Sequence, residues 1–211
     1  MSKPDHSLLG IVDRYYSEKV RDHGPTARGV DWNGPESQTL RFAHLLNVAG
    51  ERRKFSINDL GCGYGALCDF LLQRGYEADY LGVDISAEMI EAARVAHAGT
   101  QRCRFLVGDR ADRIASFTVA SGIFNVRPGI DDSAWKAHAL AVLDCIRETS
   151  EDGFAFNCLS LFSDPDRRRE YLFYVDPCEM FKLCKERYAR NVALLHDYDL
   201  YEFTVLVRLR A

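Results

Sequence analysis

The chain has 211 residues, of which 47% are hydrophobic and 27% are charged, a balance that suits one globular domain with a sizeable core. The formal net charge is -4, so the chain has no overall positive field that would attract nucleic acid or an anionic membrane. No apolar run approaches the roughly 20 residues that a membrane-spanning helix needs.

Seven cysteines are scattered along the chain, and no two of them form a C-x-x-C pair. Metal centres and disulfide frameworks use closer, paired cysteines. We therefore expect reduced thiols, no metal site and a cytoplasmic protein. The N-terminus shows no basic-then-apolar signal pattern, which agrees with this expectation.

Residues 1–50 are expected to form a helical extension, or lid, ahead of a main domain over residues 51–211. Apolar residues recur at roughly helical spacing over residues 7–21. Residues 21–35 are rich in Gly and Pro, as loops are. Asn33, just before a Gly-Pro pair, is placed to cap a helix over the following residues.

From residue 55 the sequence alternates between short apolar strands and amphipathic helices. This repeated strand–helix unit implies a parallel, doubly wound α/β sheet. Predicted strands cover residues 55–60, 80–84, 103–109, 117–126 and 153–159. The predicted helix signals are Gly75 ending the first helix, Ser86 capping the second, Ser133 beginning the third and Asp176 capping the last.

The end of the chain, residues 191–209, does not repeat this unit. It holds two apolar runs separated by His-Asp-Tyr-Asp, which is too short for a crossover helix. Such a pattern predicts a hairpin, and hence an antiparallel edge. The predicted fold is a Rossmann-like, doubly wound sheet of seven strands, mostly parallel, with a C-terminal antiparallel hairpin.

Three glycines lie between the first predicted strand and the first helix, at Gly61, Gly63 and Gly65. At such a place backbone N–H groups are free to face a ligand. Asp84 follows about twenty residues later, where an acid can bind ribose hydroxyls. The pattern favours a loop that binds a nucleoside-containing ligand over glycines that only form a tight turn. A dinucleotide is one of the ligands that fit the pattern.

Asp59 helps to distinguish these ligands, because it lies directly before the glycine loop. A carboxylate there gains nothing from a pyrophosphate but attracts a ligand that carries an ammonium and a sulfonium. The predicted hairpin also does not belong to the usual parallel dinucleotide-binding sheet, and we expect no separate substrate domain after the sheet.

With these residues in view, the sequence resembles the class I S-adenosylmethionine-dependent methyltransferases. Residues 59–65, Asp-Leu-Gly-Cys-Gly-Tyr-Gly, match the first motif of that family, and Asp84 matches its ribose-binding acid. Val-Gly-Asp at residues 107–109 matches the segment whose acid meets the adenine amine. The resemblance covers residues 56–209 and is strongest to small single-domain bacterial members of unassigned substrate.

The resemblance implies S-adenosylmethionine as cofactor and a set of donor-binding residues. Asp59 would act on the ammonium, Asp84 on the ribose and Asp109 on the adenine amine. Trp32, in the lid, is added because an aromatic face favours a sulfonium. The full predicted set is Asp59, Gly61, Cys62, Gly63, Asp84, Ile85, Met89, Gly108, Asp109, Ser121 and Trp32.

The acceptor side is less defined. Many family members that methylate amines or bases carry Asn-Pro-Pro-Tyr after the fourth strand, whereas residues 120–126 here are Ala-Ser-Gly-Ile-Phe-Asn-Val, so a nucleic-acid base is not favoured. Candidate catalytic residues are His23, Tyr15 and Asn125, each with an ordinary structural role as the alternative. Arg167, Arg168 and Arg169 either bind an anionic group or form a solvated charge run.

We therefore predict a methyltransferase that acts on a small molecule. An RNA or protein methyltransferase, or a non-catalytic sensor or partner subunit of the same fold, is left open, and a nicotinamide oxidoreductase is more distant. The methyl acceptor, the use of a general base and the oligomeric state are not set by these patterns.

Overall fold

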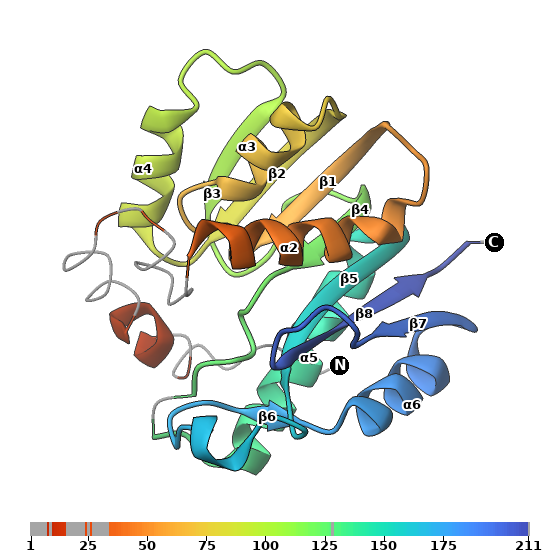
Figure 1. The fold of residues 1–211 in the computed structure, drawn as a ribbon. Helices are drawn as coiled ribbons and strands as arrows, with labels where there is room; N and C mark the ends of the chain where they lie inside the picture. The colour runs from red at the N-terminus through yellow and green to blue at the C-terminus, as the bar shows by residue number, and fades with distance from the viewer. Residues whose placement is uncertain are drawn as a thin grey trace.

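A computed structural model of the chain shows a sheet with helices on both faces (Figure 1). The predictions for Trp32, His23 and Asn33 lie outside the residues that it describes. The described residues are 8, 10–15, 24, 26, 34–127 and 129–210.

Seven strands form one continuous sheet in the order β3-β2-β1-β4-β5-β8-β7, and a short β6 pairs with β5 beside this path. The first five strands are parallel, whereas β8 runs antiparallel to both β5 and β7. The predicted mixed sheet with a C-terminal hairpin is confirmed. The strands are β1 (Lys54–Leu60), β2 (Glu77–Asp84), β3 (Cys103–Val107), β4 (Ala115–Ala120), β5 (Ser150–Ser160), β6 (Tyr174–Val175), β7 (Asn191–Leu195) and β8 (Glu202–Arg208).

Helices α2, α3 and α4 contribute to one buried cluster, and α5 and α6 contribute to another on the opposite face. Alternate residues of the central strands feed the two clusters: Phe154 and Phe156 belong to one and Ala155 to the other. This explains why β5 is apolar on both faces. The helices are α2 (Pro35–Leu46), η2 (Asn47–Ala49), α3 (Ala66–Gln73), α4 (Ala87–Ala96), α5 (Asp132–Glu148), η3 (Pro165–Arg167) and α6 (Pro177–Arg187).

Helix ends follow their predicted caps closely. The Ser86 hydroxyl accepts the Met89 N–H at 3.3 Å, and Asp176 accepts N–H groups at the start of α6. Gly75 follows α3 with φ 70°, a left-handed conformation that favours glycine. Helix α5 begins one residue before the expected Ser133, because the preceding aspartate caps it.

Strand β4 is shorter than predicted. It ends at Ala120, whereas apolar residues had suggested a strand as far as residue 126. Gly122 has φ 76° and accepts a hydrogen bond from the Asn125 N–H, so the chain turns at this point. The apolar side chains after the turn are buried, but in the wall of a cavity and not in a strand.

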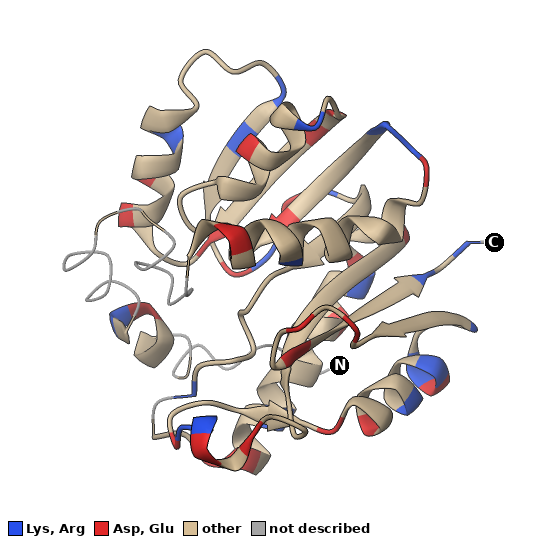
Figure 2. Cartoon of the chain, in the orientation of Figure 1, with Lys and Arg blue, Asp and Glu red and all other residues tan. Residues whose placement is uncertain are grey.

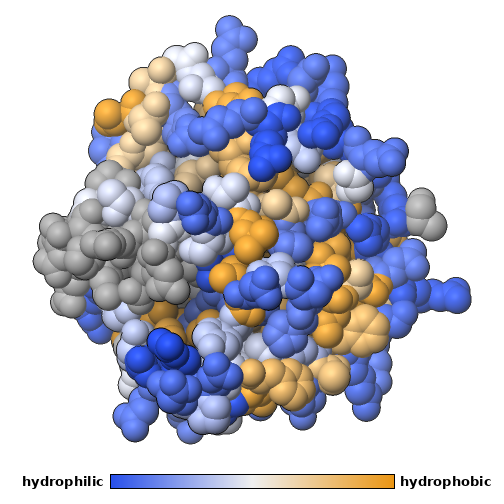
Figure 3. Space-filling model, in the orientation of Figure 1, coloured by the Kyte–Doolittle hydropathy of each residue, from blue (hydrophilic) through white to orange (hydrophobic). Residues whose placement is uncertain are grey.

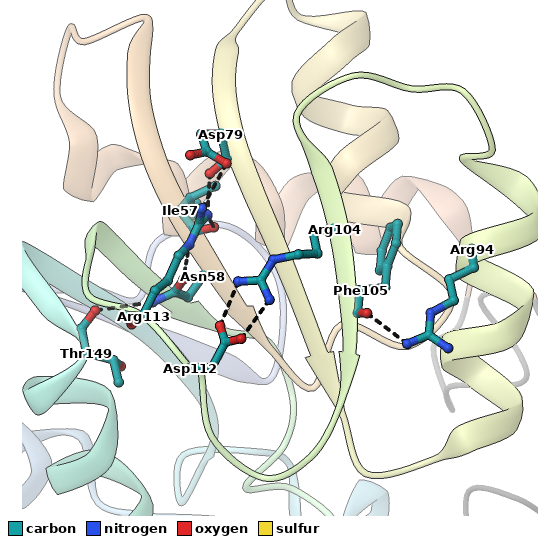
Figure 4. A network of polar contacts seen from close by, with 9 residues as sticks. All are labelled: Ile57, Asn58, Asp79, Arg94, Arg104, Phe105, Asp112, Arg113 and Thr149. Carbon is teal, nitrogen blue, oxygen red and sulfur yellow. Dashed lines mark hydrogen bonds and ion pairs between the residues drawn. The ribbon is translucent and has the colours of Figure 1, made fainter.

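The connection between β3 and β4, residues 108–114, has no helix and is fixed by arginines (Figure 4). Arg104 donates two hydrogen bonds of 2.7 Å to Asp112. Arg113 donates to the Asp79 carboxylate at 2.8 Å and to its main-chain oxygen at 2.6 Å. These contacts hold the connection against the neighbouring strands, and so they fix its first residues at the end of β3.

Cys68 of α3 and Cys103 of β3 are paired as a disulfide. This corrects the expectation that all thiols are reduced. The sequence separation of 35 residues gave no signal, because the pairing depends on how α3 packs on the sheet. The remaining five cysteines are free.

Basic and acidic residues are interspersed over the described part of the ribbon in Figure 2. On the face seen in Figure 3, hydrophilic side chains surround smaller apolar areas. Within the described part of the chain, no helix combines the length and the apolar character that crossing a membrane requires.

Candidate active site

A cavity of about 600 Å³ lies at the C-terminal ends of the parallel strands. Its walls include Asp59 at the end of β1, Asp84 at the end of β2, Ser121 after β4 and Leu159 near the end of β5. Open α/β sheets bind their ligands at this edge. The volume is within the range of small-molecule sites, roughly 300–1,000 Å³.

Most of the predicted donor-binding residues meet in this cavity. Met89 is not among the residues that line it, and its side chain is 2% exposed. Trp32 lies outside the described residues. The predicted residues that line the cavity are Asp59, Gly61, Cys62, Gly63, Asp84, Ile85, Gly108, Asp109 and Ser121.

The glycine loop needs its glycines for two reasons. Gly61, Gly63 and Gly65 have φ values of 75°, 54° and 88°, in the left-handed region that other residues rarely adopt. A Cβ atom on Gly61 would also lie 2.2 Å from Cγ2 of Ile123, closer than two atoms can approach. The loop therefore exposes main chain to the cavity while the segment after β4 packs directly against it.

Asp84 joins the glycine loop to the end of β2. Its Oδ2 accepts the Gly63 N–H at 2.8 Å, and its Oδ1 accepts the Ser86 N–H at 3.0 Å. Burial raises the pKa of Asp84, and these two N–H groups oppose that rise. A carboxylate has about four lone-pair sites, so it retains acceptor capacity for ligand hydroxyls.

Asp59 is 3% exposed and accepts a hydrogen bond of 2.7 Å from the Tyr80 hydroxyl. Burial raises the pKa of Asp59 from 3.8 to about 7, with a smaller contribution from the nearby Asp84 charge, while the Tyr80 hydrogen bond lowers it. Among the described residues, no Lys, Arg or His forms an ion pair with Asp59. A desolvated carboxylate of this kind attracts a cationic group in a ligand.

Arg41 and Glu202 line another part of the cavity and were not predicted. Arg41 Nε donates to Glu202 Oε2 at 2.8 Å and its Nη2 donates to Oε1 at 2.6 Å. Both side chains are buried. They are 161 residues apart, and a single arginine in an amphipathic helix ordinarily indicates a solvent-facing position. The two residues can be recognised as a pair only once the packing of α2 beside β8 is known.

Asn125, a predicted catalytic candidate, lines the cavity and also holds the chain together. Its Oδ1 accepts the Leu159 N–H at 3.2 Å, and its main-chain oxygen accepts the Phe173 N–H at 2.8 Å. Asn125 therefore has a structural role, which was the alternative to a catalytic role for this residue. A direct part in catalysis stays a prediction.

The described part of the N-terminal segment reaches the cavity. Val12, in a helical turn at residues 10–15, lines it. The Tyr15 ring lies 6.3 Å, between centroids, from the Tyr171 ring, which also lines the cavity. His138 of α5 lines it as well and was missed, because a single histidine in a helix carries no signal of its own. The predicted candidate His23 lies outside the described residues.

The three consecutive arginines divide into two groups. Arg168 is held by the main-chain oxygens of Ser163 and Leu161, and its guanidinium lies over the Tyr174 ring. Arg167 and Arg169 line the cavity. The run is therefore neither wholly solvated nor wholly directed at a ligand; Figure 2 shows basic and acidic residues together at η3.

Comparisons with known proteins agree with this geometry. Residues 57–128 match the family model described as "Methyltransferase domain". The chain is 54% identical over 163 residues to the "Putative methyltransferase Rv1506c" of Mycobacterium tuberculosis, an alignment that covers 77% of this chain and 98% of the relative. The chain belongs to the class I S-adenosylmethionine-dependent methyltransferases, and S-adenosylmethionine is its methyl donor.

Solved structures share the fold at low sequence identity. Human N-acetylserotonin methyltransferase in complex with S-adenosylmethionine matches with a TM-score of 0.65 and 17% identity, over 97% of this chain and 59% of its own. The 1,6-didemethyltoxoflavin-N1-methyltransferase of Burkholderia thailandensis matches with a TM-score of 0.64 and 17% identity, over 99% and 91% of the two chains. Its structure holds 1,6-didemethyltoxoflavin and S-adenosylhomocysteine.

Proposed function

We propose that this methyltransferase acts on a small molecule, which binds in the same cavity as the donor. The main support is the composition of that cavity: the glycine loop, Asp59 and Asp84 form one part of its wall, and Arg41 and Glu202 form another. The names of the two structural relatives, which refer to N-acetylserotonin and 1,6-didemethyltoxoflavin, support the same class of acceptor. The basic and acidic residues interspersed along the described chain give a nucleic-acid substrate no comparable support.

Under this proposal the donor occupies the part of the cavity beside the glycine loop. Asp59 binds its ammonium, because the buried carboxylate gains most from a cation. Asp84 accepts hydrogen bonds from the ribose hydroxyls, since Gly63 and Ser86 already orient it. The remaining predicted residues that line the cavity surround the adenine and the methionyl part: Gly61, Cys62, Ile85, Gly108, Asp109 and Ser121.

The bound donor supplies a methyl group that its sulfonium already activates. The task of this chain is then to hold the acceptor in line and to exclude water, and such positioning contributes several kcal/mol. A general base is needed only where the acceptor arrives protonated. His23 stays the candidate for that role, whereas Asn125 stays a candidate for a hydrogen bond to the acceptor and Tyr15 for an aromatic contact with it.

We further propose that residues 1–50 act as a lid over this cavity. Val12 in the cavity wall and the Tyr15–Tyr171 contact support this for the described residues. Closure by such a segment would exclude water from the sulfonium and position the acceptor. Helix α2, at the end of this range, also packs on the sheet through Leu45, which is fully buried.

The expected cytoplasmic location is also part of the proposal. Free cysteines such as Cys62 and Cys158 support a reducing compartment, whereas the Cys68–Cys103 pair does not. Fractionation of cells that produce the tagged protein tests this location directly, and recovery outside the cytoplasmic fraction would refute it.

The function itself is tested by methyl transfer from isotopically labelled S-adenosylmethionine to fractionated small-molecule extract. We expect label in at least one fraction below about 1 kDa, and S-adenosylhomocysteine in equal amount. Donor binding should raise the melting temperature, whereas NAD should not. Label that appears only in RNA or protein, or donor binding without any transfer, would contradict the small-molecule proposal.

A further inference from the structure

The Arg41–Glu202 pair has a location that stability alone does not explain. It joins α2 to the first residue of β8, with two hydrogen bonds of 2.8 and 2.6 Å. The side chains are 6% and 3% exposed, and both residues line the cavity. It is thus a nearly desolvated ion pair in the wall of a ligand site.

Burying two charges costs desolvation energy that their attraction often only balances, so an apolar pair of similar size commonly serves stability as well or better. Helix α2 already packs on the sheet through Phe42, Leu45 and Leu46, all of which are buried. Attachment of α2 therefore does not require charged residues at positions 41 and 202. Their presence at the cavity indicates another role.

The surroundings of the pair are polar. Gln38, one turn before Arg41 in α2, also lines the cavity and accepts a hydrogen bond of 3.0 Å from the Tyr64 hydroxyl. Asp199, in the loop before β8, lines the cavity as well. Each oxygen of Glu202 accepts one hydrogen bond from Arg41, and a carboxylate has about four acceptor sites. Glu202 thus has acceptor capacity beyond the pair.

We infer that the Arg41–Glu202 pair is a specificity-determining subsite for the methyl acceptor, in which Glu202 accepts a hydrogen bond from an O–H or N–H group of the acceptor and Arg41 orients the carboxylate. This rests on the proposed function of the same cavity. The acceptor is accordingly a polar small molecule with a hydroxyl, amide or amine group, and not a purely apolar ring. Such a site strongly rejects analogues that lack the donor group, because its own polar atoms are then left unpaired.

The test replaces the pair by apolar residues of similar size, Arg41→Met with Glu202→Leu, in the full-length chain. The matched control is Arg187→Met with Asp144→Leu. That pair joins α6 to α5 with hydrogen bonds of 2.8 and 2.6 Å and does not line the cavity. A third variant, Glu202→Gln, keeps the shape of the side chain and removes its charge.

Acceptor kinetics are measured with labelled S-adenosylmethionine and the extract fraction that the wild-type enzyme methylates, and donor affinity is measured by calorimetry. We expect kcat/KM for the acceptor to fall at least tenfold in Arg41→Met/Glu202→Leu and in Glu202→Gln, mainly through KM. Donor affinity should stay within about twofold of wild type in both. The control should change neither quantity by more than about twofold.

Two results would overturn the inference. In the first, both variants at positions 41 and 202 keep wild-type acceptor kinetics. In the second, donor affinity falls in parallel with acceptor kcat/KM, so that the pair only supports the donor site or the fold. If the apolar double variant does not fold, Glu202→Gln alone decides between these outcomes. Failure of the wild-type enzyme to methylate any fraction would instead contradict the proposed function.

Discussion

The hydroxyl of Tyr80 donates a hydrogen bond of 2.7 Å to Oδ2 of Asp59, at a position where both side chains are buried. This bond lowers the pKa of Asp59, but burial has the larger effect and raises that pKa to about 7. The Asp59 carboxyl group in the cavity wall therefore changes charge near neutral pH, and a cationic ligand will be bound more tightly above pH 7 than below it.

Donor binding should consequently depend on pH through Asp59. Below pH 7 the carboxyl group is mostly protonated and offers the donor ammonium no ion pair, whereas above pH 7 it is ionised. We expect donor affinity to rise about tenfold or more between pH 5.5 and pH 8, since the ionised fraction of a group with a pKa near 7 rises about 30-fold over that range. Calorimetry at several pH values measures this.

The control for this experiment is Asp59→Asn, which keeps the shape of the side chain and a hydrogen-bond acceptor for Tyr80. It should bind the donor weakly, and its affinity should vary less with pH than that of wild type. An equal pH dependence in wild type and variant would assign the effect to another group, such as Asp84, whose pKa is also raised by burial.

The same titration predicts how donor-free stability depends on pH. The folded pKa of about 7 exceeds the usual value of 3.8, so the unfolded chain loses this proton first as the pH rises. The free energy of unfolding should therefore fall between about pH 4 and pH 7 and then level off. Asp59→Asn should be more stable than wild type at pH 8, by roughly 1–4 kcal/mol, and the difference should shrink at pH 5. Urea titrations at the two pH values check this; a constant difference would contradict it.

Asp84→Ala should weaken donor binding by roughly 2–4 kcal/mol, because hydrogen bonds to a charged group are the stronger kind. Asp84 also accepts N–H groups of Gly63 and Ser86, so some loss of melting temperature is expected. Asp84→Asn serves as the comparison, since it keeps one acceptor oxygen but has no charge. Unchanged affinity in a folded Asp84→Ala variant would place the ribose elsewhere.

Gly61→Ala should be destabilising, because its φ of 75° disfavours any side chain and the new Cβ would collide with Ile123. We expect a loss of about 1–3 kcal/mol in the free energy of unfolding, with a larger loss of donor affinity. Ile123→Ala in the same chain removes the collision but not the backbone strain. Partial recovery of stability in the double variant is therefore expected, and full recovery would show that only the collision matters.

Trp32→Ala tests the lid. If residues 1–50 close over the donor, this variant should lose about 1–2 kcal/mol of donor affinity, the range for a desolvated contact between an aromatic ring and a cation. In the wild-type chain the fluorescence of Trp32 should respond to donor binding. Trp135→Phe provides a background in which Trp32 is the only tryptophan. Wild-type affinity and turnover in Trp32→Ala would leave the lid without its main residue.

The part of the cavity wall around the glycine loop could be predicted from the sequence, because it depends on contiguous segments. The glycines of the loop and Asp84 each end or follow a strand, and parallel strands bring their C-terminal ends together. Met89 is near Asp84 in sequence and is buried, but it is not among the residues that line the cavity, so its part in donor binding stays a prediction.

The part of the wall that contains the Arg41–Glu202 pair could not be predicted in the same way, because it depends on tertiary pairing. Arg41 and Glu202 meet only after α2 has packed on the sheet beside β8, and neither residue has a local signal. The Cys68–Cys103 pair was missed for the same reason. The predicted end of β4 was wrong, because the apolar residues beyond Ala120 line a cavity. In the sequence, such a run of apolar residues looks the same as the continuation of a buried strand.

The position of β8 has a consequence for biosynthesis. It is the last strand of the sheet in sequence but lies inside it, between β5 and β7. While a ribosome is still synthesising residues 202–208, one edge of β5 has no partner strand and presents Phe154 and Phe156 beside open backbone groups. Such an edge is a template for pairing with other chains. Nascent chains stalled before β8 should therefore depend most on chaperones and aggregate most readily.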